Sequence, residues 1–286
     1  MLLRDFKAAH LQAPRGRSHD PSWLDGSAKG RPAFILGGAG GLVDSPGLAA
    51  AKGQIVIGTN WTLRLLEPTI WLVVDGNVWK SESARISGCS DSMVTVVSKG
   101  IFGGGVYSVA HSQKMKMVGT KKVQPLEIRI RPFAGIQRKG KKYGLRPFPP
   151  YVPNSASELF HPGGNSLCFA IQLAHVMGCN HIVASGFTLQ SGSNYHFGGN
   201  INPATRRPSV YQPDLAMAWL AWYSSAFPGR VLLDPSFDGP VTSVLRKAAP
   251  GEIERIARAQ HANGGGHESD QGSKSGHEEG SLRQDV

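Results

Sequence analysis

Four glycines within one short stretch are the clearest chemical signal in this sequence. Gly37, Gly38, Gly40 and Gly41 follow the apolar run Ala33 to Leu36 directly. A residue without a Cβ lets a ligand approach the main chain closely, and a turn with exposed N–H groups can hold a phosphate. Because such a turn can also serve only to pack a helix against a strand, the spacing alone is a weak indication of a nucleotide.

Polar residues end the next two apolar runs. The run Ile55 to Ile57 leads to Asn60, a neutral donor and acceptor that suits a ribose or a base. A dinucleotide fingerprint would have an acidic residue there, and a Walker A loop would continue as Gly-Lys-Ser/Thr, so neither motif is present. The run Ile70 to Val74 ends in Asp75, where an open sheet would place a carboxylate for ribose or Mg²⁺. A plain turn before Gly76 is the alternative for Asp75.

Positive charge is concentrated in one segment. The net charge is +11, and eleven basic residues with a single acid, Glu127, lie between Lys114 and Arg146. This block predicts binding to a polyanion such as DNA or RNA, to an acidic membrane surface or to a nucleotide, with a solvated loop as the alternative. The predicted acceptor-binding residues are Arg129, Arg131, Arg138, Lys139, Lys141 and Lys142.

Short apolar strands and amphipathic helices must position these residues. Besides the runs above, the pattern predicts strands at Val94 to Val97 and His181 to Ser185, and helices after Asn165-Ser166 and from Pro213 to about Phe227. Ser166 is the expected N-cap of the first of these helices. We therefore predict the α/β class, a Rossmann-like open, mostly parallel sheet with helices on both faces and a basic inserted flap at 114–155. Ligands bind such a sheet beyond the carboxyl ends of its strands.

The sequence predicts one domain between two irregular ends. Residues 1–30 are expected to form a flexible basic arm with a short helix at Leu2 to Leu11, and residues 31–250 to form the nucleotide-binding domain. Residues 251–286 are expected to form a short helix and a disordered tail. The chain has no long apolar run, and its three cysteines form no C-x-x-C pair. The N-terminal residues are not expected to be a secretory signal, because they have no apolar core followed by a cleavage site. These features predict a cytoplasmic protein without a transmembrane segment, a disulfide framework or a structural zinc site.

Four short motifs, taken in order, resemble the bacterial lipooligosaccharide sialyltransferases and the related archaeal 6-hydroxymethylpterin pyrophosphokinases, a Rossmann-like family. The motifs are Gly37-Gly38-Ala39-Gly40-Gly41-Leu42, Asn60, Asn165-Ser166 with Met177-Gly178, and Ser185-Gly186-Phe187-Thr188 with Gly192-Ser193-Asn194-Tyr195. The sequence departs from the family in two of these motifs. It lacks the Pro-Ser that follows the family's glycines, and Thr188 stands where the family has Asp.

The resemblance implies a nucleotide-dependent transferase. The leading interpretation is a glycosyltransferase that uses a nucleotide-sugar donor, and the alternative is a phosphoryl transferase of the pyrophosphokinase type. The resemblance implies that the glycine turn, Asn60 and Ser166 hold the nucleotide, with Thr188 at the same site, and that Tyr195 is a catalytic residue that binds the phosphate. The family's general-base histidine has no counterpart near Ser209.

Two other histidines are candidates for the missing base. His196 and His161 could each accept a hydroxyl proton near neutral pH, although a lone loop histidine is more often solvated. The charge of the basic block predicts that the acceptor substrate is anionic, with DNA or RNA the leading choice. It also leaves a second class of function open, which is a non-catalytic nucleic-acid-binding protein on the same fold.

Overall fold

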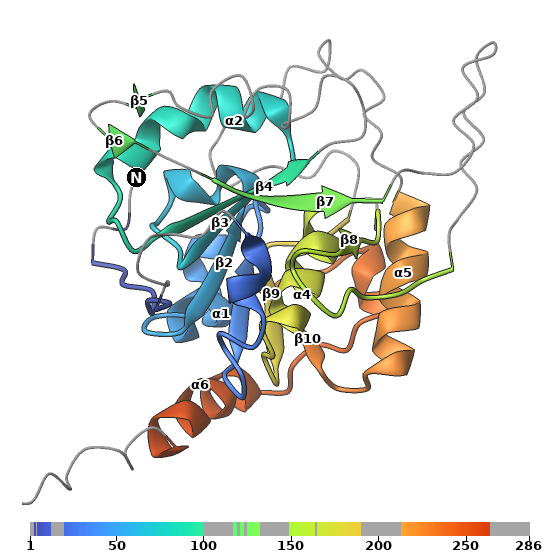
Figure 1. Cartoon of the computed structure of the whole chain (residues 1–286). Helices are drawn as coiled ribbons and strands as arrows, with labels where there is room; N and C mark the ends of the chain where they lie inside the picture. The colour runs from blue at the N-terminus through green and yellow to red at the C-terminus, as the bar shows by residue number, and fades with distance from the viewer. Residues whose placement is uncertain are drawn as a thin grey trace, which may run out of the picture.

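A parallel sheet of eight strands forms the centre of the molecule (Figure 1). The computed structural model describes residues 3, 5–12, 20–99, 117–118, 121–122, 125–131, 149–163, 165–189 and 213–263. Neighbouring strands of the main sheet all pair in parallel, which confirms the predicted α/β class with a Rossmann-like open sheet. In spatial order the strands are β10 (Val231–Leu233), β9 (Ile182–Ser185), β1 (Ala33–Leu36), β2 (Ile55–Thr59), β3 (Ile70–Val73), β4 (Val94–Lys99), β7 (Leu126–Ile130) and β8 (Leu159–Phe160). Strands β5 (Met117–Val118) and β6 (Lys121–Lys122) form a separate antiparallel pair.

Helices cover both faces of the main sheet. Ala33 and Ile35 on β1 belong to one apolar cluster with residues of α4 and α5, whereas Phe34 and Leu36 belong to another with residues of α1 and α6. The strands therefore bury side chains on both faces, which explains why they read as continuous apolar runs. The α-helices are α1 (Pro46–Ala50), α2 (Gly76–Glu82), α4 (Ser166–Val176), α5 (Pro213–Ala226) and α6 (Glu252–Asn263). The 3-10 helices are η1 (Pro21–Leu24), η2 (Leu42–Asp44), η3 (Asn60–Arg64), η4 (Ser83–Gly88) and η6 (Pro240–Ser243).

The order of the strands reverses between β1 and β9. From β1 the chain builds the sheet outward through β2, β3, β4, β7 and β8, and then returns through α4 to add β9 on the other side of β1. The chain after β1 continues into α1 on one face, and the helix that follows β9 along the chain, α5, packs on the opposite face. Such a reversal is the switch point at which open α/β sheets bind their ligands.

The N-terminal segment differs from the predicted flexible arm. Residues 5–12 form no helix; instead their main chain lies along the body of the protein, where Ala9 N donates to Gln54 O over 2.8 Å. Leu3 N likewise donates to Leu65 O over 2.7 Å. Leu24 in η1 is completely buried against α4 and its neighbours. These long-range partners outweigh the helical spacing of the sequence, so the predicted helix at Leu2 to Leu11 is wrong.

Residues 126–130 of the predicted flap at 114–155 belong to the main sheet. Strand β7 belongs to the main sheet, where it pairs with β4 on one side and β8 on the other. Leu126 and Ile128 are buried and Arg129 is exposed, so the alternation that predicted a half-exposed strand is confirmed. Residues 132–148, which carry much of the basic block, lie outside the described residues.

The helices predicted near the C-terminus are confirmed as α5 and α6, whereas residues 264–286, the predicted tail, lie outside the described residues. Over the part of the chain that the structure describes, no helix combines the length and the apolar character that crossing a membrane requires.

Candidate functional site at the carboxyl edge of the sheet

The loops that follow the parallel strands gather at one edge of the sheet, the edge toward which the strand arrows in Figure 1 point. The structure brings the glycine turn after β1, Asn60 after β2 and Thr188 after β9 to this edge. These three strands are immediate neighbours in the sheet. Asp75 follows β3, one strand further along.

The first glycine of the turn has a packing role. Gly37 N donates to Ser185 O over 2.8 Å, and Ala39 N donates to Gly186 O over 3.0 Å. A Cβ added at Gly37 would collide with the carbonyl oxygen of Gly186. Gly37 is therefore required because the backbones after β1 and β9 touch, which is the packing alternative that the sequence left open.

The second half of the turn is more open. Gly40 and Gly41 are exposed, and Gly41 has φ +85°, where an added Cβ would have no atom within 4 Å. Among the described residues, no protein acceptor takes the main-chain N–H groups of Gly38, Gly40 or Gly41. Main-chain N–H groups clustered in a turn with a left-handed residue form the kind of concavity that binds an anion.

The N-terminus of the helix after the turn is already occupied. Gly47 N donates to Asp234 Oδ2 over 2.8 Å, and Leu48 N donates to Ser45 Oγ over 3.2 Å. Asp234 is fully buried and also accepts from Ser185 Oγ at 2.9 Å and from Ser236 N at 3.0 Å. The carboxylate of Asp234 already occupies the N-terminus of α1, where a helix favours a negative charge. A phosphate that binds at this edge must therefore use the N–H groups of the glycine turn itself.

Asn60 holds the ends of β2 and β3 together. It has φ 49°, a left-handed conformation that Asn tolerates better than most residues. Its Oδ1 accepts from Val74 N at 3.2 Å, and its main-chain oxygen accepts from Trp71 Nε1 at 2.7 Å. Within the described residues its amide nitrogen has no acceptor, so a donor remains at the end of β2.

Ser166 is the first residue of α4 and is not its N-cap. Asn165 has an extended backbone, with φ −155°, and its side chain accepts from Cys168 N at 3.1 Å. The N-cap is therefore Asn165 and not Ser166 as predicted, because the side-chain oxygen of Asn165 accepts the hydrogen bond from Cys168 N in the first turn of the helix. Ser166 is half-buried at the start of a helix that packs against β1, β2 and β3.

Asp75 and Thr188 differ in exposure. Asp75 is exposed, and its main-chain oxygen accepts from Trp79 N at 3.1 Å near the start of α2. No group of three metal-binding side chains occurs among the described residues, so Asp75 lies outside any such cluster there. Thr188 is half-buried, and its main chain contacts Gly239, where an added Cβ would collide with Thr188 O.

His161 is a buried ring at the end of β8. Its Nδ1 accepts from Gly163 N at 3.1 Å, which places the proton of the neutral ring on Nε2. The ring stacks on Trp219 with the centroids 6.2 Å apart, and its edge meets Tyr151. These contacts favour a structural role over that of a general base, because the Nδ1 lone pair is already used. Tyr195 and His196, the other predicted catalytic residues, lie outside the described residues.

Two of the predicted acceptor-binding arginines are described. Arg129 is exposed on β7 and its Nη2 donates to Ser157 O. Arg131 follows the same strand, and its guanidinium lies 5.8 Å from the centre of the Tyr151 ring. Burial raises the pKa of Tyr151, and the charge of Arg131 opposes that rise. Arg138, Lys139, Lys141 and Lys142 lie outside the described residues.

The structure adds a group of residues that sequence reasoning missed. Arg64 lies at the end of η3, and its guanidinium is 4.3 Å from the centre of the Trp61 ring. Its Nη2 donates to the carboxylate of Glu82, whose side chain is completely buried. Arg85 Nε donates to the other oxygen of Glu82 over 2.8 Å. The sequence signal was Trp61-x-x-Arg64 directly after Asn60, at the end of a strand.

The electrostatics of this group keep Glu82 ionised. Burial raises the pKa of the Glu82 carboxyl, but hydrogen bonds from Arg64, Ser81 and Arg85 together lower it below its ordinary value. The hydrogen bond to Glu82 raises the pKa of Arg64. Two guanidinium groups therefore share one carboxylate, and the three side chains together carry a net charge of +1.

Comparisons with protein-family models, with curated proteins and with solved structures found no match for the chain. The resemblance based on short motifs therefore stays a prediction, and the geometry of the carboxyl edge carries the functional argument.

Proposed function

We propose that the chain is a transferase that binds a nucleotide donor at the carboxyl edge of its sheet. The observation that carries this proposal is the coincidence of the β1–β9 switch point with a turn in which Gly38, Gly40 and Gly41 present N–H groups without a protein acceptor among the described residues. Phosphate oxygens are strong acceptors that such N–H groups bind well.

The remaining polar groups fit other parts of a nucleotide. Asn60 offers an amide donor beside the turn, and Ser166 offers a hydroxyl at the start of α4. In the transfer that we propose, an acceptor hydroxyl attacks the sugar carbon and releases its proton to solvent. The bond from that carbon to the phosphate oxygen breaks, and the nucleotide leaves with the bonding electrons. The turn would stabilise the charge that develops on the leaving phosphate.

The acceptor side is proposed from charge. Arg129 and Arg131 are exposed at the end of β7 and lie in the most basic segment of the sequence. An anionic acceptor such as DNA or RNA suits these side chains. We include Mg²⁺ as a candidate cofactor through Asp75, which would be tested by titrating nucleotide with and without the ion.

The proposal is tested by a thermal-shift screen against nucleoside mono-, di- and triphosphates and nucleotide sugars. A ligand at 100 times its Kd adds about 2.7 kcal/mol to the free energy of unfolding, which is readily detected. The Kd of the best ligand is then measured by calorimetry for Gly41→Asp and for a matched control, Gly53→Asp. Both glycines have positive φ, +85° and +75°, and at neither would an added Cβ have an atom within 4 Å.

Only Gly41→Asp should weaken binding, by about tenfold or more, because its carboxylate would repel a phosphate at the turn. Gly53 precedes β2 at the opposite edge, so Gly53→Asp should bind as the wild type does. Equal affinities for the two variants would contradict the placement. A chain that binds no nucleotide but binds DNA with a steep dependence on salt would instead be the non-catalytic nucleic-acid-binding protein.

A further inference from the structure

We infer that Arg64, presented by Trp61 and Glu82, binds a phosphate group of the ligand, so that the site selects nucleoside phosphates over uncharged nucleosides. The inference rests on the proposed function, whose site it extends by one side chain. Arg64 supplies the charge that touches the ligand, whereas Trp61 and Glu82 are positioning residues.

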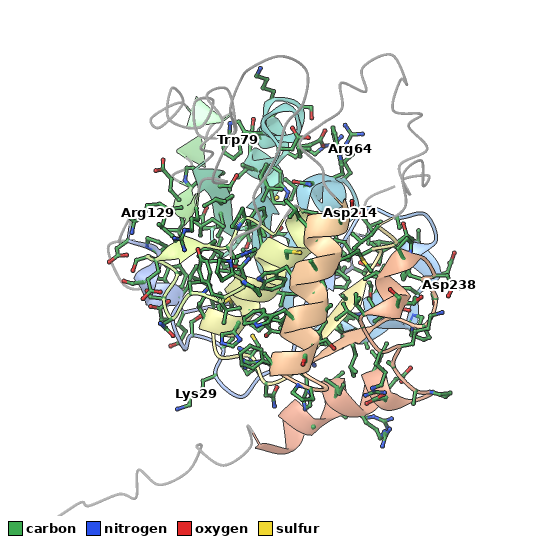
Figure 2. All side chains as sticks on the ribbon, turned by 90° about the vertical axis from the view of Figure 1, so that its right-hand side faces the viewer. Lys29, Arg64, Trp79, Arg129, Asp214 and Asp238 are labelled. Atoms are coloured by element: carbon green, nitrogen blue, oxygen red, sulfur yellow. The ribbon has the colours of Figure 1, made fainter. Side chains whose placement is uncertain are left out.

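The short helix η3 is fixed next to the glycine turn. Thr59 Oγ1 and Thr62 Oγ1 both donate to the main-chain oxygen of Leu36, over 3.1 and 3.0 Å. Leu36 is the last residue of β1 and directly precedes Gly37. Arg64, two residues after Thr62, therefore belongs to a turn that is bonded to the start of the proposed phosphate site. Figure 2 shows Arg64 at the upper, carboxyl edge of the molecule and Lys29 at the lower edge.

The guanidinium of Arg64 is held in place before any ligand arrives. Glu82 accepts a hydrogen bond from it, and the ring of Trp61 lies under its plane. The side chain of Arg64 is still 34% exposed. An arginine whose rotamers are restricted by a carboxylate and an aromatic ring loses less entropy when it binds an anion, and its planar fork matches phosphate oxygens.

The charge balance of the group also favours an anion. Glu82 already has Arg85 as a partner, three residues away along the chain. Arg64, Arg85 and Glu82 together carry two positive charges and one negative charge, and a phosphate is favoured beside a group with a net positive charge.

The experiment compares Arg64→Gln with Arg85→Gln. Both variants remove one positive charge and one partner of the same carboxylate, but Arg85 is on η4 and is more exposed, with 52% of its side chain accessible. Titration calorimetry is carried out with inorganic pyrophosphate, with a nucleoside diphosphate and with the matching uncharged nucleoside. Urea unfolding shows whether each variant is folded, and if Arg64→Gln is not, then Arg64→Lys is compared with Arg85→Lys.

We expect Arg64→Gln to lose about ten- to a hundredfold in affinity for pyrophosphate and for the nucleoside diphosphate, and to keep its affinity for the nucleoside. Arg85→Gln should stay within about twofold of the wild type for all three. Equal losses in the two variants, with a wild type that binds nucleotide, would overturn the inference and leave the proposed function standing. Arg64-dependent binding of pyrophosphate without any nucleotide binding would support the inference and overturn the proposed function. A wild type that binds neither probe at millimolar concentration would overturn both.

Discussion

Replacing Asp234 with Asn should remove a large part of the stability of the protein. The carboxylate is fully buried and accepts three hydrogen bonds, from Gly47 N, Ser185 Oγ and Ser236 N. The side chain of Asn has one oxygen where Asp has two. In Asp234→Asn, the NH₂ group therefore replaces one acceptor oxygen and faces at least one of these donors. Hydrogen bonds to a charged acceptor contribute about 1.5–3 kcal/mol each, and a buried donor without a partner costs about 1–3 kcal/mol. We therefore expect Asp234→Asn to lower the free energy of unfolding by about 2–3 kcal/mol, and Asp234→Ala by about 4 kcal/mol.

The assay is urea unfolding followed by tryptophan fluorescence, which the six tryptophans of the chain make sensitive. The control is Asp238→Asn, the same chemical change nearby on an aspartate whose side chain is 85% exposed and paired with Lys247. Exposed ion pairs contribute little, so the control should stay within about 0.5 kcal/mol of the wild type. A loss for Asp234→Asn no larger than that of the control would refute the reasoning that the buried carboxylate anchors α1.

Two further predictions concern buried titratable groups. Burial, with a smaller contribution from Arg230, lowers the pKa of His175 to about 4, so the unfolded chain takes up the proton first as the pH falls below about 6.5. The free energy of unfolding should therefore fall by about 1–2 kcal/mol between pH 6.5 and pH 4, a value discounted because the ring is only partly buried. His175→Gln should remove this part of the pH dependence of urea unfolding. A variant with the same pH profile as the wild type would contradict the prediction. Burial raises the pKa of Cys179 to about 12 and that of Cys168 still further, whereas Cys89 is half-buried. An aromatic disulfide reagent at pH 8 should accordingly modify Cys89 in the native protein and the other two thiols only after unfolding. Equal reaction rates for the three thiols in the native protein would contradict this prediction.

The sheet could be predicted because burial on both faces leaves a direct trace in the sequence. Runs such as Ala33 to Leu36 and Ile182 to Ser185 are apolar at nearly every position, and polar or glycine residues follow each of them. The topology that places those ends together follows from the general behaviour of parallel strands. The glycine turn, Asn60 and Thr188 were therefore brought to one edge as expected, although a packing contact accounts for Gly37.

The rest depends on partners that are distant in the sequence. Gly47 and Asp234 are 187 residues apart, and nothing near Gly47 indicates that a carboxylate will reach its N–H group. Glu82 reads as an ordinary surface residue of a helix until the fold brings Arg64 against it. The N-terminal segment shows the same effect, because Ala9 and Leu3 find main-chain acceptors that helical spacing alone could not reveal.

The pairing of β1 with β9 has a consequence for how the chain is made. Ala33 lies opposite Ile182, and Ile35 lies opposite Ala184, so the middle of the sheet joins the first part of the chain to a late part. During synthesis β1 can add β2, β3, β4, β7 and β8 on one side as they emerge, but its other edge stays unpaired until β9 has left the ribosome. A nascent chain that stops before Ile182 therefore exposes an apolar strand edge at its centre, which is the kind of surface that chaperones bind and that drives aggregation.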